Sequence, residues 1–167
     1  NHIQIESMFQ SNNNETSPII TLNESFTNLY NSQDIHKIQK YAYKSAIIQS
    51  KRKSSGSINE LEGVMFKGIE KFKGNFFFNE YLIKGKCPTW SKKINDTIVI
   101  SKEIGKKLNL KINNKISAFF VSDGKPKQRN LTIGGIYETG LNKIDSKFIF
   151  IDLKYLQKIN KWGIQLK

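Results

Sequence analysis

The clearest pattern of apolar and polar positions lies between residues 98 and 140. Residues 98–100 (IVI) form a β-branched run without polar alternation, which predicts a buried strand. Ser101 follows, and its hydroxyl can accept a hydrogen bond from the first turn of a helix. Ile104 and Leu108 would share one face of that helix, because residues four apart are neighbours on a helix surface. Asn109 predicts the end of the helix, since asparagine tolerates the left-handed conformation.

The residues that follow predict a β-hairpin. A strand is expected over 115–121, and Asp123-Gly124 is typical of the tight turn between two antiparallel strands. The returning strand is expected over 129–138. Gly134 and Gly135 interrupt that strand, and no helix follows them directly, so they indicate a bulge or a close backbone approach rather than a phosphate-binding loop.

Elsewhere the elements are shorter. Alternation at His2–Met8 predicts a half-buried strand, and Leu22, Phe26, Leu29 and Tyr30 have helical spacing. The other expected elements are a long hairpin from strands within 35–50 and 61–69, a short helix ending at Gly85, a buried strand over 148–151 and a helix capped by Asp152. Residues 163–167 are expected to begin another strand.

Several of these segments resemble one family of membrane proteins. ISKEIGKKLNL, NNKISAFFV, RNLTIGGIYETGLNKID and FIFIDLKYLQKIN, in this order, are similar to the extracytoplasmic domain of type VII ABC-transporter permeases, the MacB, LolC/LolE and FtsX-like membrane subunits. Among these, the chain looks closest to the lipoprotein-releasing permeases. The upstream segments NHIQIES, LEGVMFKGIEK and FFFNEYLIKGKCP also fit, so the resemblance covers nearly the whole chain.

The resemblance implies an α+β fold with two lobes. One would be a membrane-proximal strand-helix-strand-strand (Porter-like) half, and the other an inserted, mostly-β (Sabre-like) lobe. The matching layout places residues 1–72 and 163–167 in the membrane-proximal lobe, whose second half is largely missing, and residues 73–162 in the inserted lobe. The longest apolar runs have only a few residues, so we expect no segment that spans a bilayer. Because the sequence starts inside an apparent strand, we interpret it as an excised soluble fragment of a larger protein.

The resemblance also implies a function without catalysis. The domain would lie on the periplasmic side of the bacterial inner membrane, as part of a membrane-anchored permease. The expected partners are an ABC ATPase subunit, a second permease copy or homologue, a periplasmic carrier or adaptor protein, and a lipoprotein or other exported cargo. In such systems an extended hairpin recruits the carrier. The matching hairpin here looks short, and a solvated β-turn is the alternative interpretation; its residues are Ser122, Asp123, Gly124, Lys125, Pro126, Lys127 and Gln128. A MacB-like efflux or mechanotransmission domain that docks an adaptor is the second possibility within the family.

The amino-acid composition suggests a third class of function. The net charge of +13 suggests a basic module that binds nucleic acid or anionic lipid. However, Arg52 and Arg129 are the only arginines, and base readout and bidentate phosphate contacts favour arginine over lysine. Lysine is instead spread along a chain that is also rich in asparagine and isoleucine, as in an AT-rich genome. We therefore expect a solvated basic surface and no nucleic-acid partner.

The residues that carry enzyme chemistry are scarce. With one cysteine, Cys87, and two distant histidines, His2 and His36, the chain is not expected to form a structural zinc site or a Cys-His nucleophile pair. Each Gly-Lys pair lacks the second glycine and the Ser/Thr of a P-loop. The sequence therefore predicts no catalytic residues, no metal and no cofactor, with ATP hydrolysis in a separate subunit.

Overall fold

A computed structural model of the chain describes residues 28, 38–50, 60–70, 76–87, 94–122 and 124–162. Within these ranges the strands are β1 (Tyr41–Ser50), β2 (Leu61–Ile69), β3 (Leu82–Gly85), β4 (Thr97–Ser101), β5 (Lys115–Ser122), β6 (Lys125–Tyr137) and β7 (Phe148–Asp152). The helices are α2 (Phe76–Tyr81), α3 (Lys102–Lys107), α4 (Asn142–Asp145) and α5 (Leu153–Ile159).

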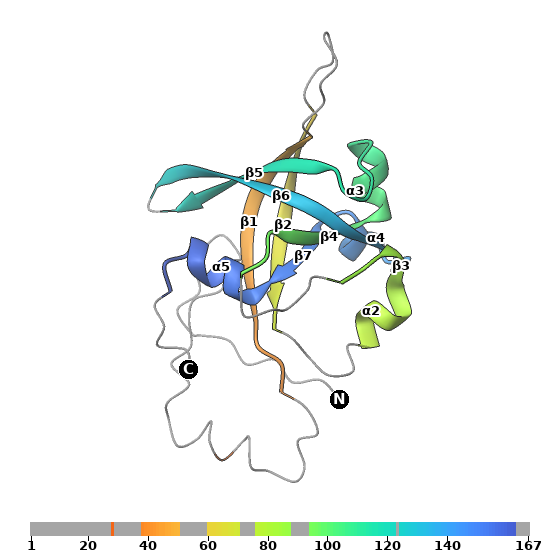
Figure 1. The fold of residues 1–167 in the computed structure, drawn as a ribbon, viewed down its shortest axis with the longest axis horizontal. Helices are drawn as coiled ribbons and strands as arrows, with labels where there is room; N and C mark the ends of the chain where they lie inside the picture. The colour runs from red at the N-terminus through yellow and green to blue at the C-terminus, as the bar shows by residue number, and fades with distance from the viewer. Residues whose placement is uncertain are drawn as a thin grey trace.

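The described strands form one sheet that closes on itself (Figure 1). Their order is β3-β6-β4-β7-β2-β1-β5, and β5 pairs back onto β6. Six strands therefore make a barrel, while β3 lies beside β6 outside the ring. The β2–β7 and β4–β6 pairs are parallel, whereas β1–β2, β1–β5, β5–β6 and the single β4–β7 pair are antiparallel. Because the ring is closed, each of its six strands pairs with a neighbour on both sides.

β6 is the strand that closes the barrel. Its first part pairs with β5 and its last part with β4, and Thr132 faces both Lys115 and Thr97. Between Ile98 and Val99 of β4, the partner in β6 moves from Ile133 to Gly135, so Gly134 is an extra residue. The predicted bulge at Gly134-Gly135 is confirmed. A bulge reverses the faces of the residues beyond it, so Ile133 packs in the barrel core and Tyr137 packs outside it.

Apolar side chains fill the barrel. The core includes Phe66, Phe120, Ile98, Ile116 and Ile133, all without exposed surface. Two helices close the ends, since the core also contains α3 residues (Ile104) and α5 residues (Leu153, Leu156, Ile159). The predicted caps explain where these helices begin: Ser101 Oγ accepts a hydrogen bond from Ile104 N, and Asp152 accepts one from Lys154 N.

A second, smaller core lies outside the barrel. Ile69, Phe78, Val99, Tyr137 and Phe150 are buried there. Phe77 of α2 contacts Phe150 with ring centroids 4.8 Å apart, and it also lies against Tyr137 at 5.7 Å. This cluster attaches α2 to the outer surface of β4 and β7.

The expected two-lobed α+β arrangement is wrong. β1 and β2, expected in the membrane-proximal lobe, pair with β5 and β7, expected in the inserted lobe, so one mostly-β sheet contains both sets. The inner positions of β1, such as Ala46 and Ile48, are buried in the same core as Ala118 and Phe120. The exact boundary between residues 72 and 73 falls outside the described residues, and the proposed domain limits stay predictions.

The local predictions have mixed outcomes. The buried strand over 98–100, the β1–β2 and β5–β6 hairpins and the left-handed Asn109 (φ 47°) are confirmed. The helix expected to end at Gly85 is partly wrong, because it ends at Tyr81 and β3 follows. The expected strands at residues 2–8 and 163–167 lie outside the described residues. Of the helix expected around residues 22–30, only residue 28 is described, and it is helical.

Candidate functional site

The described residues of the predicted binding hairpin, Ser122 and 124–128, lie at the tip of the β5–β6 ribbon. Ser122 pairs with Lys125, so only two residues separate the paired ends of β5 and β6. Gly124 has φ +70°, which favours glycine. Asp123 and the side chain of Ser122 lie outside the described part of the chain. The described candidate residues therefore lie together at a short tip, as expected.

The two faces of this ribbon differ in chemistry. On the outer face, Gln128 Nε2 donates to Ser117 Oγ at 3.0 Å. Lys125, Lys127 and Arg129 occupy alternate positions of β6 and so share the opposite face. Arg129 Nη1 donates to the Gln128 carbonyl oxygen at 2.8 Å. The ribbon can offer cations and hydrogen-bonding groups to a partner.

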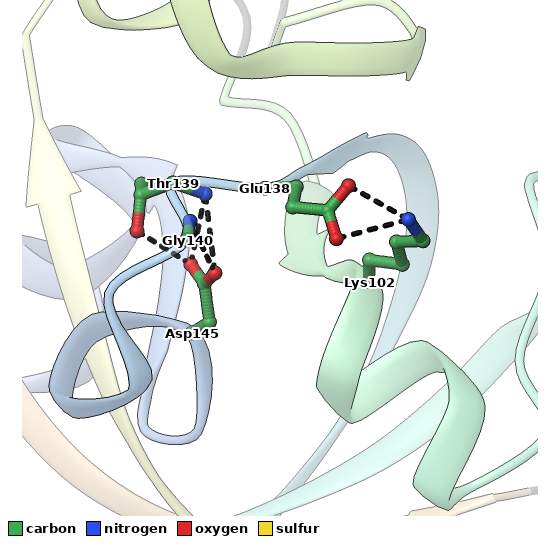
Figure 2. A network of polar contacts seen from close by, with 5 residues as sticks. All are labelled: Lys102, Glu138, Thr139, Gly140 and Asp145. Atoms are coloured by element: carbon green, nitrogen blue, oxygen red, sulfur yellow. Dashed lines mark hydrogen bonds and ion pairs between the residues drawn. The ribbon is translucent and has the colours of Figure 1, made fainter.

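A second set of polar residues lies where β6 ends (Figure 2). The Asp145 carboxylate of α4 accepts from Thr139 N at 3.1 Å, from Thr139 Oγ1 at 2.8 Å and from Gly140 N at 3.0 Å. Asp145 is almost fully buried. Its backbone carbonyl also accepts a hydrogen bond from the Ser101 hydroxyl, which caps α3. This network joins the end of β6 to α3 and α4.

An exposed ion pair lies next to the same turn. Lys102 Nζ is 2.7 Å from the nearer Glu138 oxygen, and both side chains are about two-fifths exposed (41% and 43%). Figure 2 shows Glu138 directed toward α3 and the adjacent Thr139 directed toward Asp145. Because the donors and the acceptors satisfy one another, this region is suited to fixing a turn rather than to binding a substrate.

Two further polar side chains, Tyr137 in β6 and Asp152 at the end of β7, are buried. Tyr137 has no exposed surface, and its hydroxyl lies 2.8 Å from the Phe148 carbonyl oxygen and 3.2 Å from that of Ile144. Burial raises the pKa of Tyr137 far above its ordinary value. Burial also raises the pKa of Asp152, although the hydrogen bond from Lys154 N lowers it. The second carboxylate oxygen of Asp152 has no hydrogen-bond partner among the described residues.

The described residues hold no group of three or more His, Cys, Asp or Glu side chains that could bind a metal ion. Cys87 is half-buried, and burial raises the pKa of its thiol, so it is a weak nucleophile at neutral pH. His2 and His36 lie outside the described residues. Within the described ranges, no helix has both the length and the apolar character required to cross a membrane.

Comparisons with solved structures show a distant likeness. No family model matches the chain, and no curated protein matches it. Among solved structures, it is similar to a crystallised domain of a candidate permease protein from Porphyromonas gingivalis, with 16% sequence identity and a TM-score of 0.35. The match covers 74% of this chain and 56% of that one, so the chain spans little more than half the length of this neighbour.

Proposed function

We propose that this chain is part of the extracytoplasmic domain of an ABC-transporter permease and catalyses no reaction of its own. The observation that carries the proposal is where the four family-like segments lie. They correspond to β4 with α3, to β5, to β6 with α4, and to β7 with α5. These elements adjoin one another in one barrel, so the resemblance follows a continuous folded body instead of scattered matches.

The barrel suits a mechanical role. Its strands are hydrogen-bonded in a closed ring, and the helices α3 and α5 pack into the same apolar core. Such a body has few soft degrees of freedom, so a displacement at one end moves the other end with it. In the proposed role, ATP hydrolysis in a separate subunit would move this domain by rigid-body rotation.

At a finer level we propose that the parent permease releases lipoproteins and passes them to a periplasmic carrier. The resemblance to lipoprotein-releasing permeases supports this, and the β5–β6 tip from Ser122 to Gln128 would contact the carrier. The two-residue turn gives that tip little reach. This shortness favours a second candidate, a MacB-like permease whose domain docks an adaptor protein.

The first test is the gene that encodes the parent protein. Apolar segments of about 20 residues should occur on both sides of the complete domain, since that length spans a bilayer as a helix. A parent that encodes no such segment would refute the permease assignment. Substrate turnover by the purified chain would equally refute a role without catalysis.

The second test concerns the hairpin in the parent protein, expressed with its ATPase subunit. Residues 123–127 are replaced by a Gly-Ser stretch, and capture of the carrier or adaptor encoded nearby is measured. We expect capture to be lost. The control replaces the exposed Lys84 and Lys86 by serine and should retain capture. Equal capture by the hairpin variant and the control would remove the hairpin from the site.

A further inference from the structure

The outer surface of β2, β1 and β5 carries an apolar patch that is uncovered. Ile47, Leu61 and Val121 are 50%, 59% and 60% exposed. Ile47 lies directly opposite Phe119 on β5, and Leu61 and Val121 belong to the strands on either side of it. These four residues, called the β1 patch below, form a contiguous surface, because same-face neighbours on paired strands lie within contact distance.

Gly63 lies beside the centre of this patch. It is directly opposite Ile47 in β2, and a Cβ added to it would meet nothing within 4 Å. The missing side chain leaves one flank of Ile47 bare, so the patch is hollowed next to its central residue.

This glycine has no structural explanation within the described residues. Glycine weakens a strand unless it serves a bulge, a bend or a close approach. The β1–β2 register is unbroken from Tyr41–Ile69 to Gln49–Leu61, and Gly63 is not among the residues with positive φ. Three of the other described glycines have positive φ: Gly85, Gly124 and Gly140. At the remaining four, an added Cβ would lie within 3.5 Å of another atom: Gly68, Gly105, Gly134 and Gly135. A partner group that approaches Gly63 closely would explain its presence.

The charges around the patch indicate the chemistry of that partner. The outward positions of β1, β2 and β5 carry Lys67 and Lys115 and no carboxylate in their described ranges. Glu62 points to the other side, where it pairs with Lys107 at 2.6 Å. With a net charge of +13, a second copy of the chain would be repelled, whereas an acidic surface would be attracted.

We propose that the β1 patch is a docking surface for an acidic protein segment, which inserts an apolar side chain over Gly63 between Ile47 and Leu61. Carboxylates further along the segment, on either side of that residue, would face Lys115 at one end of the outer surface and Lys67 at the other. Lys67 Nζ lies over the rings of Tyr41 and Tyr43. This surface lies on the body of the barrel, apart from the hairpin tip, and the proposal does not depend on the permease assignment. An apolar centre with a polar rim is the usual composition of a protein interface.

The test uses the 167-residue chain and a displayed library of random peptides. Selected peptides are then measured by calorimetry against the unmodified chain, Gly63→Gln and Ile47→Ser. Gly63→Gln fills the hollow without strain, and Ile47→Ser removes the central apolar side chain without adding bulk. The control is Ile83→Ser, which changes another exposed isoleucine on β3.

We expect peptides with an apolar residue flanked by Asp or Glu, whose affinity falls at least tenfold for both patch variants and is unchanged for Ile83→Ser. Higher salt and the substitution Lys115→Glu should also weaken the binding of these peptides. Peptides without acidic residues, or peptides unaffected by Gly63→Gln, would overturn the proposal. If the chain binds phosphatidylglycerol vesicles and Gly63→Gln abolishes this binding, the occupant of the patch is a membrane. If the chain forms a dimer that Gly63→Gln dissociates, the occupant is a second copy. Either result would overturn the proposal.

Discussion

Replacing Asp145 by alanine tests the importance of the polar network in Figure 2 for the stability of the barrel. The substitution removes the acceptor of three hydrogen bonds, from Thr139 N, Thr139 Oγ1 and Gly140 N. The N-cap of α3 is affected as well, because the Ser101 hydroxyl donates to the backbone carbonyl oxygen of residue 145, which the lost side chain no longer ties to the turn. We expect the turn after β6 to loosen and the free energy of unfolding to fall.

The size of the loss follows from the contacts. A hydrogen bond to a charged acceptor contributes about 1.5–3 kcal/mol. Gly140 is exposed and Thr139 is half-buried, so water can replace part of what is lost. We therefore expect Asp145→Ala to lower the free energy of unfolding by about 3 kcal/mol, less than the sum of three full bonds.

Urea unfolding followed by tryptophan fluorescence measures this loss, since Trp162 packs against the barrel core. The control is Glu138→Gln, which breaks the exposed ion pair with Lys102 and should cost about 0–1 kcal/mol. A loss below about 1 kcal/mol for Asp145→Ala, or one equal to that of the control, would show that the network does not hold the turn.

Three other variants test separate features. Gly135→Ala places a Cβ 2.7 Å from the Lys86 carbonyl oxygen and should lower the free energy of unfolding by about 1–3 kcal/mol. Its control, Gly63→Ala, adds a Cβ in open space and should be neutral or slightly stabilising. Equal midpoints of thermal unfolding for the two variants would contradict the close packing at the bulge. Tyr137→Phe keeps the ring but removes the hydroxyl that donates to the Phe148 carbonyl oxygen, at a cost of about 1–2 kcal/mol in urea unfolding. Tyr81→Phe, at a partly exposed position, should cost less. Because burial raises the pKa of Asp152 above its ordinary value of 3.8, its contribution to stability is complete below that pH and is lost as pH rises through the folded value. Asp152→Asn keeps the cap and should gain stability relative to the unmodified chain as pH rises from 3.8 toward neutrality; thermal midpoints across that range that move the other way would refute the burial argument.

The sequence alone determined features that depend on a few neighbouring residues. Ser101 and Asp152 mark helix starts because an N-cap acts within three residues of itself. Asp123-Gly124 fixes the hairpin, and Gly134-Gly135 indicates the bulge, because glycine relieves local backbone constraints. The binding role of the hairpin stays a prediction.

Only the tertiary structure decided which strands pair. The alternation in β1 shows that Ala46 and Ile48 point inward, but the same pattern would suit any apolar neighbour, and their neighbours come from β5, about 70 residues away. For this reason the two-lobed expectation failed, although the six strands of the barrel were recognised. The burial of Asp145 and the empty space beside Gly63 are likewise set by contacts between distant segments. Backbone preferences and caps are local and can be read along the chain, whereas strand partners and surface hollows depend on how the sheet closes.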